Sequence, residues 1–297
     1  MTSVELLDDP VAFLAEAAGV LAADPVLGTV VATVTERMAA GWDAATPPEH
    51  PCWWLLVRDA AGAVVGVGMR TAPFAPYPPY LLPVPDDAVR ELARVLDARG
   101  EHVGGVNGAL PASRLLAEEM ARLQGQQAHV EEQVRLFEVP SAGDLVEPAP
   151  AAGSFRLATA HDLDLVVRWF HAFHAAAAEQ AGRGGEHGRE LGLSDADLAA
   201  RVDAGCVALW EVDGEPVHLT GSNPPAYGVV RVGPVYTPRE HRGRGYASNA
   251  VHEVTRRALA AGHRACLFTD QANPTSNRVY TALGYAPVVD MAHLLVG

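Results

Sequence analysis

The chain has 297 residues, of which 49% are hydrophobic and 20% charged, a balance typical of a packed soluble protein. Its formal net charge of −14 repels phosphate backbones and argues against a general nucleic-acid-binding protein. The three cysteines are odd in number and far apart, and no set of four metal ligands is evident, so neither a disulfide framework nor a zinc site is predicted.

No apolar run approaches the length of a membrane span. The first residues, MTSVELLDDP, lack a basic segment before an apolar one. We therefore expect a cytoplasmic protein with no membrane segment and no metal ion. The length suits two domains of ordinary size as well as one large domain.

The first half of the chain predicts helices followed by a hairpin. Apolar residues recur at helical spacing between residues 5 and 45, and the prolines between residues 47 and 51 end this segment. Strand-like runs at 52–58 and 63–71 then flank a turn sequence at 59–62.

The rest of this half alternates extended and helical segments. The proline-rich segment 72–85 is expected to be extended, and an amphipathic helix opened by acidic residues follows at 86–98. A helix at 113–123 and a strand at 133–139 come next. The stretch SAGDLVEPAPAAGS, residues 141–154, interrupts all periodicity, and we place a linker at 143–154.

The second half repeats the order of the first, with helices before a hairpin, and this repetition indicates an internal duplication. A glycine-rich segment from Gly182 to Gly188 is expected to break its first helix. The expected elements are a strand at 155–157, helices at 163–179 and 194–204, strands at 206–212 and 216–220, and closing strands within 286–296.

A strand, a glycine loop and a helix follow one another from Val229 onward. The apolar run Val229–Tyr236 predicts the strand, and helical periodicity begins at Ala247. Between them, Arg242-Gly243-Arg244-Gly245-Tyr246-Ala247 allows a tight turn that gathers N–H groups beside the free N–H groups of the helix. Such a point attracts a phosphate or pyrophosphate.

A polar helix follows a short strand expected at 265–269. Asn273 is a suitable N-cap, a proline occupies the first helical position, and Gly284 is a suitable end. Asn273, Asn277 and Tyr280 are four and three residues apart and therefore share one side of this helix. The phosphate loop is thus followed by a polar stripe that carries a phenol.

These two segments resemble the GCN5-related N-acetyltransferases. The family's coenzyme A motif, Gln/Arg-x-x-Gly-x-Gly/Ala, is matched by Arg242, Gly245 and Ala247, and its Asn-Pro-x-x-Asn-x-x-Tyr-x-x-x-Gly-Tyr/Phe segment by residues 273–285. The resemblance covers about the last half of the chain. It implies an α/β (α+β) fold with a mixed, largely antiparallel sheet flanked by helices, and direct transfer of an acetyl group from acetyl-CoA to a primary amine.

The resemblance also suggests how the whole chain is organised. Tandem members with one degenerate half are a known arrangement, so residues 1–142 are interpreted as a degenerate N-terminal copy and residues 155–297 as the catalytic domain. Residues 104–109 stand where a strand and turn are expected in the first copy, but they lack the coenzyme A motif. The alternative is a helical and hairpin extension without duplication.

The resemblance assigns roles to the residues around the loop. In the family, backbone groups at the end of the strand bind the pantetheine arm and polarise the thioester carbonyl, the loop binds the pyrophosphate, and an asparagine contacts the pantetheine arm. The expected cofactor-binding residues are Val235, Tyr236, Thr237, Arg242, Gly243, Arg244, Gly245, Tyr246, Ala247, Asn273, Asn277 and Tyr280.

Tyr280 matches the family's general acid. A phenol with a pKa of about 10 can protonate a thiolate whose acid has a pKa of about 8.5 to 9, provided that it lies within hydrogen-bond reach. Structural alternatives remain open for this group of residues. Tyr280 could be a packing tyrosine, Tyr236 a half-buried strand residue, Asn273 a helix cap and Asn277 an exposed helix residue.

The sequence does not indicate the general base. Family members often carry a glutamate on the strand before the loop, but residues 229–236 contain no carboxylate. An alkyl amine is only about 0.1% neutral at pH 7, so such an acceptor needs a base. Asp270, His218 and Glu211 are candidates, and a water chain could replace them; Asp270 is the one that we include among the predicted catalytic residues.

The missing glutamate also favours an alternative, a catalytically inactive acyl-CoA-binding regulatory protein. A nucleotide-binding enzyme of another type is less well supported, because the chain has no Walker lysine and lacks the dinucleotide glycine spacing. The expected acceptor is a small-molecule or peptide amine. Monomer and homodimer both remain open.

Overall fold

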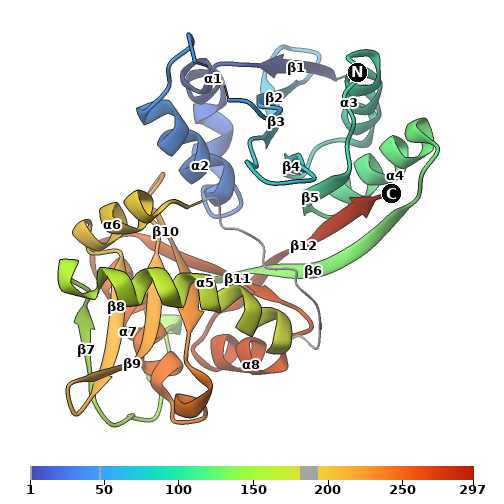
Figure 1. Cartoon of the computed structure of the whole chain (residues 1–297). Coiled ribbons are helices and arrows are strands. Elements are labelled where there is room, and N and C mark those ends of the chain that lie inside the picture. The colour runs from blue at the N-terminus through green and yellow to red at the C-terminus, as the bar shows by residue number, and fades with distance from the viewer. Residues whose placement is uncertain (1, 47, 181–192) are drawn as a thin grey trace. The chain divides into compact units, whose positions relative to one another are not determined.

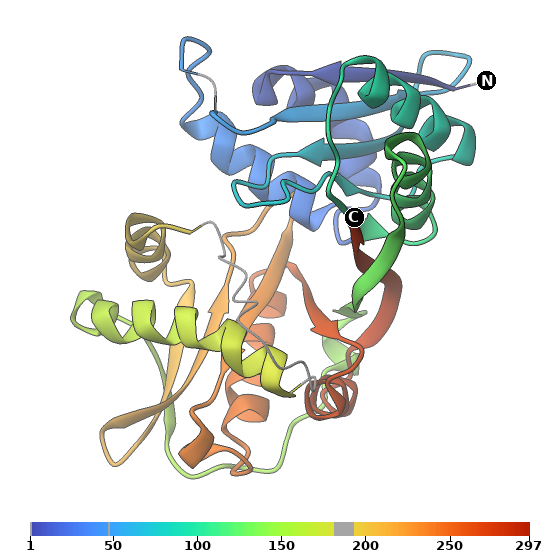
Figure 2. The ribbon, with the colours of Figure 1, turned by 45° about the vertical axis from the view of Figure 1, so that its right-hand side comes forward.

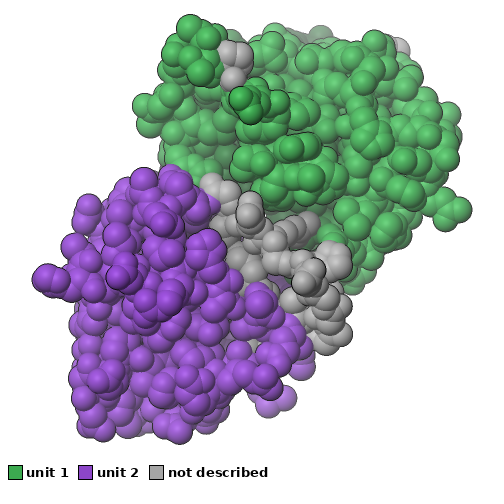
Figure 3. All heavy atoms as spheres, viewed as in Figure 1, with its two compact units in different colours: residues 1–134, 289–297 green, residues 135–288 purple. Residues whose placement is uncertain are grey.

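The computed structural model describes residues 2–46, 48–180 and 193–297. The chain divides into two compact units, which Figure 3 shows in different colours. Unit 1 consists of residues 1–134 and 289–297, and unit 2 of residues 135–288. The expected helix break at 182–188 lies outside the described residues.

Unit 1 alternates strands and helices in the order that the sequence predicts, with one addition at its start (Figure 1). Its elements are β1 (Ser3–Leu7), α1 (Pro10–Ala23), α2 (Thr29–Ala40), β2 (Trp53–Arg58), β3 (Val64–Arg70), β4 (Tyr80–Leu81), α3 (Asp86–Ala98), β5 (Gly105–Ala109) and α4 (Ala112–Gln124). The strand β6 (Ala128–Val139) begins in unit 1 and ends in unit 2.

The added element is the strand β1. The sequence had predicted a helix from residue 5 onward. Residues Ser3–Leu7 instead pair antiparallel with β2. The physical reason is alternation: Val4 and Leu6 pack against the unit 1 core, while Glu5 bonds Arg58 at the surface. Five residues with period two form a strand more readily than a first helical turn.

Unit 2 contains the second set of elements. They are β7 (Ser154–Leu157), α5 (Leu163–Gln180), α6 (Asp195–Asp203), β8 (Val207–Val212), β9 (Glu215–Ser222), β10 (Val229–Tyr236), α7 (Tyr246–Ala260), β11 (Arg264–Asp270) and α8 (Pro274–Ala282), with short 3-10 turns at Ala142–Asp144, Ala160–Asp162 and Arg239–His241. The last strand, β12 (Ala286–Val296), begins in unit 2 and ends in unit 1.

The two units repeat one sheet topology. In unit 1 the strand order is β1-β2-β3-β4-β5-β12, antiparallel except for the parallel pair β4 and β5. In unit 2 the order β7-β8-β9-β10-β11 is likewise antiparallel except for the parallel pair β10 and β11, and β6 lies beside β11. A helix, α3 or α7, connects each parallel pair. The predicted fold class, two mixed, largely antiparallel α/β domains, is confirmed.

The final strands are exchanged between the two copies, and this moves the boundaries away from those expected. The strand that follows α4 joins the unit 2 sheet, and the strand that follows α8 pairs with β5 of unit 1. The units therefore divide after residues 134 and 288, and not at a linker over 143–154. That segment lies along unit 2, where Val146 N–H donates to Leu283 O and the Ala152 carbonyl accepts from the Trp210 indole.

Helices cover both faces of the unit 2 sheet. Leu209 and Leu219, which are register partners, pack with Phe170 of α5, whereas the neighbouring Trp210 packs with Ala250 of α7. Figures 1 and 2 both show α5 lying across these strands. Alternation along the strands thus places one set of apolar side chains against each helical layer.

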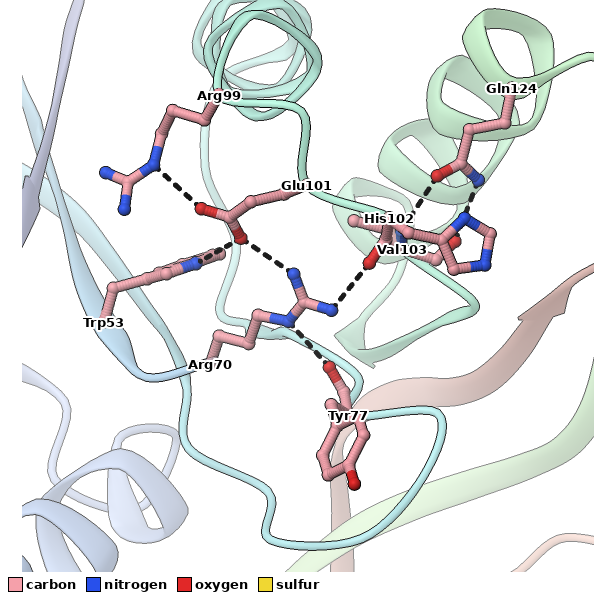
Figure 4. A network of polar contacts seen from close by, with 8 residues as sticks. All are labelled: Trp53, Arg70, Tyr77, Arg99, Glu101, His102, Val103 and Gln124. Atoms are coloured by element: carbon pink, nitrogen blue, oxygen red, sulfur yellow. Dashed lines mark hydrogen bonds and ion pairs between the residues drawn. The ribbon is translucent and has the colours of Figure 1, made fainter. Parts of the chain in front are cut away.

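One buried arginine stands out in unit 1 (Figure 4). The Arg70 side chain is 2% exposed, and its guanidinium donates to Tyr77 O, His102 O and Glu101 Oε2 at 2.7 to 2.8 Å. Glu101 also accepts from the Trp53 indole and pairs with Arg99. Burial lowers the pKa of Arg70, and the Glu101 carboxylate opposes that shift. This network joins the end of β3 to the loops at Tyr77 and His102.

Replacing Glu101 with alanine is expected to lower the free energy of unfolding by about 3 to 5 kcal/mol, because it leaves the Arg70 guanidinium buried without its counter-charge. Urea unfolding of the full chain, followed by tryptophan fluorescence, measures this loss. Glu91→Ala is the matched control, since Glu91 pairs with Arg94 at the surface and should contribute about 1 kcal/mol or less. Equal losses in the two variants would contradict the structural role of the network.

Candidate functional site

The strand β10 separates from β11 before it ends. Their parallel pairing covers Val229 to Val232, whereas β9 remains paired with β10 as far as Tyr236. The register with β9 shifts between Val232 and Val235, which is an irregularity of the kind that bends a strand. The end of β10 therefore turns away from its parallel neighbour beside the start of α7.

A pocket of about 490 Å³ lies at this place. It is formed by the end of β10, the turn after it, the first turn of α7 and one side of α8. Its lining residues are Val235, Thr237, His241, Arg242, Gly243, Arg244, Gly245, Tyr246, Ala247, Ser248, Thr275, Ser276, Val279 and Tyr280.

The glycine loop gives one wall of the pocket the character of an anion site. Gly243 and Gly245 adopt left-handed backbone angles, with φ of 76° and 82°, which residues with a Cβ rarely adopt. Gly245 is the N-cap of α7 and supplies no side-chain acceptor for the N–H groups of the first turn. That turn contains no acidic residue, and Arg242 and Arg244 line the same pocket. The wall therefore offers N–H donors, a helix dipole and positive charge.

The loop is tied to the strand through Thr237. Arg242 Nε donates to the Thr237 carbonyl at 3.0 Å, and the Thr237 hydroxyl lies 2.7 Å from His218 Nδ1. Arg242 also lies near Glu179 of α5, at 3.8 Å. The end of β10 and the loop thus form one connected structure.

The structure brings most of the predicted cofactor-binding residues to this pocket. Tyr236, Asn273 and Asn277 are not among the lining residues. The Tyr236 ring contacts Trp169, with centroids 5.8 Å apart. Asn273 caps α8 by accepting from Ser276 N–H at 3.0 Å. Asn277 donates to the carbonyls of Asp270 and Asn273 and so fastens the turn before α8.

A different stripe of α8 lines the pocket. This stripe consists of Thr275, Ser276, Val279 and Tyr280. Val279 and Tyr280 lie three and four residues after Ser276, so the side chains share one side of the helix. The sequence prediction chose the amide-bearing stripe because both asparagines match the family motif over residues 273–285, but both amides are used to start the helix. The signal for the observed stripe was present in the i, i+4 relation of Ser276 to Tyr280. His241 and Ser248 were missed because only the motif positions were considered.

Tyr280 is 6% exposed and has its ring beside that of Tyr285. Burial raises its pKa above the usual value, and a hydrogen bond with Ser276 partly offsets this. The phenol therefore keeps its proton throughout the neutral range, and Tyr280 is one of the residues that line the pocket.

None of the three candidate bases lines the pocket. His218 is fully buried, with both ring nitrogens bonded to threonine hydroxyls. Burial lowers its pKa to about 3, so the ring is neutral at pH 7. Glu211 pairs with Arg156 at 2.7 Å, and Asp270 accepts from Ala272 N–H at 2.8 Å in the turn after β11.

No described helix is long and apolar enough to cross a membrane. Among the same residues, no group of three or more histidine, cysteine or acidic side chains is placed to hold a metal ion.

Comparison with known proteins agrees with this architecture. Residues 225–292, which contain the loop and α8, match the family model described as FR47-like protein. No curated protein matches the chain in sequence.

Several solved structures share the fold over nearly the whole chain. A GCN5-related N-acetyltransferase from Sphaerobacter thermophilus has a TM-score of 0.56 at 15% identity, covering 98% of this chain and 94% of its own. A GNAT-family acetyltransferase from Colwellia psychrerythraea has a TM-score of 0.55 at 12% identity and 99% coverage of both chains. A tandem GNAT protein from the clavulanic acid biosynthesis pathway has a TM-score of 0.53 at 16% identity, with 99% and 98% coverage.

Proposed function

We propose that the chain, whose fold is similar to that of GCN5-related N-acetyltransferases, transfers an acetyl group from acetyl-CoA to a primary amine by direct attack. The observation that carries the proposal is the pocket that joins the end of β10 to the glycine loop of α7. The acceptor is a small molecule or a peptide amine, and the protein acts as a monomer or a homodimer. In this proposal unit 2 is the catalytic copy.

The residues of the pocket fit the donor. The N–H groups of residues 243–247, with the Arg242 and Arg244 side chains, would hold the pyrophosphate. The end of β10 would hold the pantetheine arm, since its backbone is paired with β9 on one side and has left β11 on the other. The pocket volume of about 490 Å³ lies in the range of small-molecule sites.

The bound thioester supplies an activated acetyl group. In the reaction the amine nitrogen forms a bond to the carbonyl carbon, the carbon–sulfur bond breaks, the nitrogen loses a proton and the departing thiolate gains one. Tyr280 holds a proton on the α8 side of the pocket and is the donor in our proposal. His218 is not assigned the removal of the proton from nitrogen, because its ring is enclosed and has a lowered pKa. The amine must therefore give that proton to water or to a group beside the bound acceptor.

The described residues of unit 1 form no equivalent anion site at the corresponding position. The topology places the start of α3, and not residues 104–109, at the position of the glycine loop, because both follow the first strand of the parallel pair. Its N-cap is Pro85, and its first turn carries Asp86 and Asp87. Hydrogen bonds from Thr2 lower the pKa of Asp87 and keep its carboxylate charged. Negative charge at this point repels phosphate, which supports the interpretation of unit 1 as a degenerate copy.

Calorimetric titration of acetyl-CoA into the intact chain is therefore expected to give one site per chain. A stoichiometry of two would contradict the degenerate interpretation of unit 1. Absence of binding would contradict the proposed function. A chain that binds acetyl-CoA but acetylates no amine in a broad panel would instead favour the second candidate, an inactive acyl-CoA-binding regulatory protein, which the lack of a carboxylate on β10 supports.

A further inference from the structure

Thr220, His218 and Thr237 form a hydrogen-bonded chain that ends at the pocket. His218 Nε2 lies 2.7 Å from Thr220 Oγ1, and its Nδ1 lies 2.7 Å from Thr237 Oγ1. His218 and Thr220 are 0% and 1% exposed, so neither can reach solvent. Thr237 is the partly exposed member and lines the pocket. These hydrogen bonds therefore connect the buried side of β9 to the place where β10 ends.

The direction of these hydrogen bonds follows from Thr220, the buried end of the hydrogen-bonded chain. A neutral imidazole has one N–H donor and one acceptor nitrogen, so the two hydroxyls must play opposite roles toward it. Thr220 Oγ1 has the His218 ring as its hydrogen-bond partner, and a buried O–H without an acceptor is costly. Thr220 therefore donates to Nε2, and Nδ1–H donates to Thr237. The Thr237 oxygen accepts, and its own hydrogen is left to be donated elsewhere.

We propose that Thr237 donates this hydrogen to the acyl carbonyl oxygen of acetyl-CoA, and that His218 and Thr220 are positioning residues that fix the direction of the donor. The inference rests on the proposed function. No proton moves along the chain: as the nitrogen attacks, the carbonyl oxygen becomes an oxyanion that accepts a stronger hydrogen bond, and the carbonyl re-forms when the carbon–sulfur bond breaks.

The same geometry gives a role to His218, which is buried and cannot reach the acceptor amine. Thr237 is already held through its carbonyl by Arg242 Nε. The His218 ring adds a second hold, on the hydroxyl, so that both polar groups of Thr237 have fixed orientations. A donor that is oriented before the substrate binds loses little entropy when it is used.

The first test compares the affinities of coenzyme A and acetyl-CoA, which needs no knowledge of the acceptor. A neutral hydrogen bond to the acyl carbonyl should improve the affinity for acetyl-CoA by about 2- to 10-fold. In Thr237→Val, which keeps the shape of the side chain and the carbonyl bonded by Arg242, the ratio of the two dissociation constants should shift by that factor. Thr237→Ser restores the hydroxyl and should restore the ratio. The kcat of Thr237→Val should fall about tenfold or more.

The outcomes separate this inference from the function on which it rests. An unchanged ratio in Thr237→Val, or an equal loss of affinity for both ligands, would overturn the role of Thr237 and leave the function standing. Failure of the wild-type chain to bind either ligand would overturn both.

The second test observes the tautomer of His218 directly. Long-range proton–nitrogen correlation spectra, with the His218 signals assigned from their absence in His218→Gln, should show the proton on Nδ1. In Thr220→Val that preference should disappear, because the donor to Nε2 is gone. A proton on Nε2 in the wild-type chain would mean that Thr237 donates to the ring, and this would overturn the proposal.

Discussion

Tyr280→Phe is expected to lower kcat by about 100-fold or more, with a change of less than about threefold in the affinity for acetyl-CoA. The substitution removes one hydroxyl from a residue that lines the pocket and leaves the ring, which packs beside Tyr285 in the unit 2 core. If Tyr280 gives its proton to the departing thiolate, the loss falls on the chemical step and not on binding. Steady-state kinetics with a responsive amine and calorimetry with acetyl-CoA measure the two quantities.

Tyr285→Phe provides a matched control for this change. Tyr285 is 2% exposed, belongs to the same cluster and likewise loses one hydroxyl, but that hydroxyl bonds Thr255 at 2.6 Å and does not line the pocket. It should lose about 1 kcal/mol of stability and retain its kcat. Equal rates for Tyr280→Phe and the wild type would remove Tyr280 as the acid.

The raised pKa of Tyr280 also predicts the shape of the pH profile. A phenol whose pKa lies above its ordinary value of about 10 stays protonated between pH 6 and 10, so its ionisation should not lower kcat within that range. The profile should rise with pH as the amine loses its proton. Loss of rate with an apparent pKa near 8 would show that another group supplies the proton.

The sequence predicted the parts of the fold that depend on local pattern. The glycine loop, β10, α7 and α8 were all placed from spacing and end residues, because left-handed glycines and helix caps act within a few residues of themselves. The repeated order of helices and hairpin predicted the duplication for the same reason. Each of these features depends on residues that are close together in the sequence.

Features that depend on distant pairing could not be predicted in this way. The exchange of β6 and β12 is decided by which sheet edge each strand meets, and nothing in residues 128–139 or 286–296 specifies that edge. The burial of His218 depends on the helices that cover β9. Asn277 differs from these features because its partners are local: it was expected at the cofactor, but its amide donates to two carbonyls of the preceding turn, which its spacing from Tyr280 does not reveal.

Gly245→Ala is expected to weaken acetyl-CoA binding by about 10- to 100-fold, the loss of roughly one or two hydrogen bonds to a charged phosphate. The fold has room for the methyl group, since the nearest atoms to an added Cβ are Ala151 Cβ at 3.6 Å and Asn249 Nδ2 at 3.7 Å. Two effects remain: the left-handed φ of 82° becomes strained, and the methyl group is added to a residue that lines the pocket. Both disturb the N–H groups of the loop.

Gly262→Ala is the matched control, because it distinguishes backbone strain outside the pocket from a change within the loop. Gly262 has the same φ of 82°, follows the other end of α7 and has no atom within 4 Å of an added Cβ. Each variant should lose about 1 to 2 kcal/mol of stability from backbone strain, measured by thermal unfolding. Because only Gly245 lines the pocket, only its variant should lose affinity in calorimetric titration. Equal affinities in the two variants would mean that the loop does not hold the pyrophosphate, and the assignment of the pocket would fail with it.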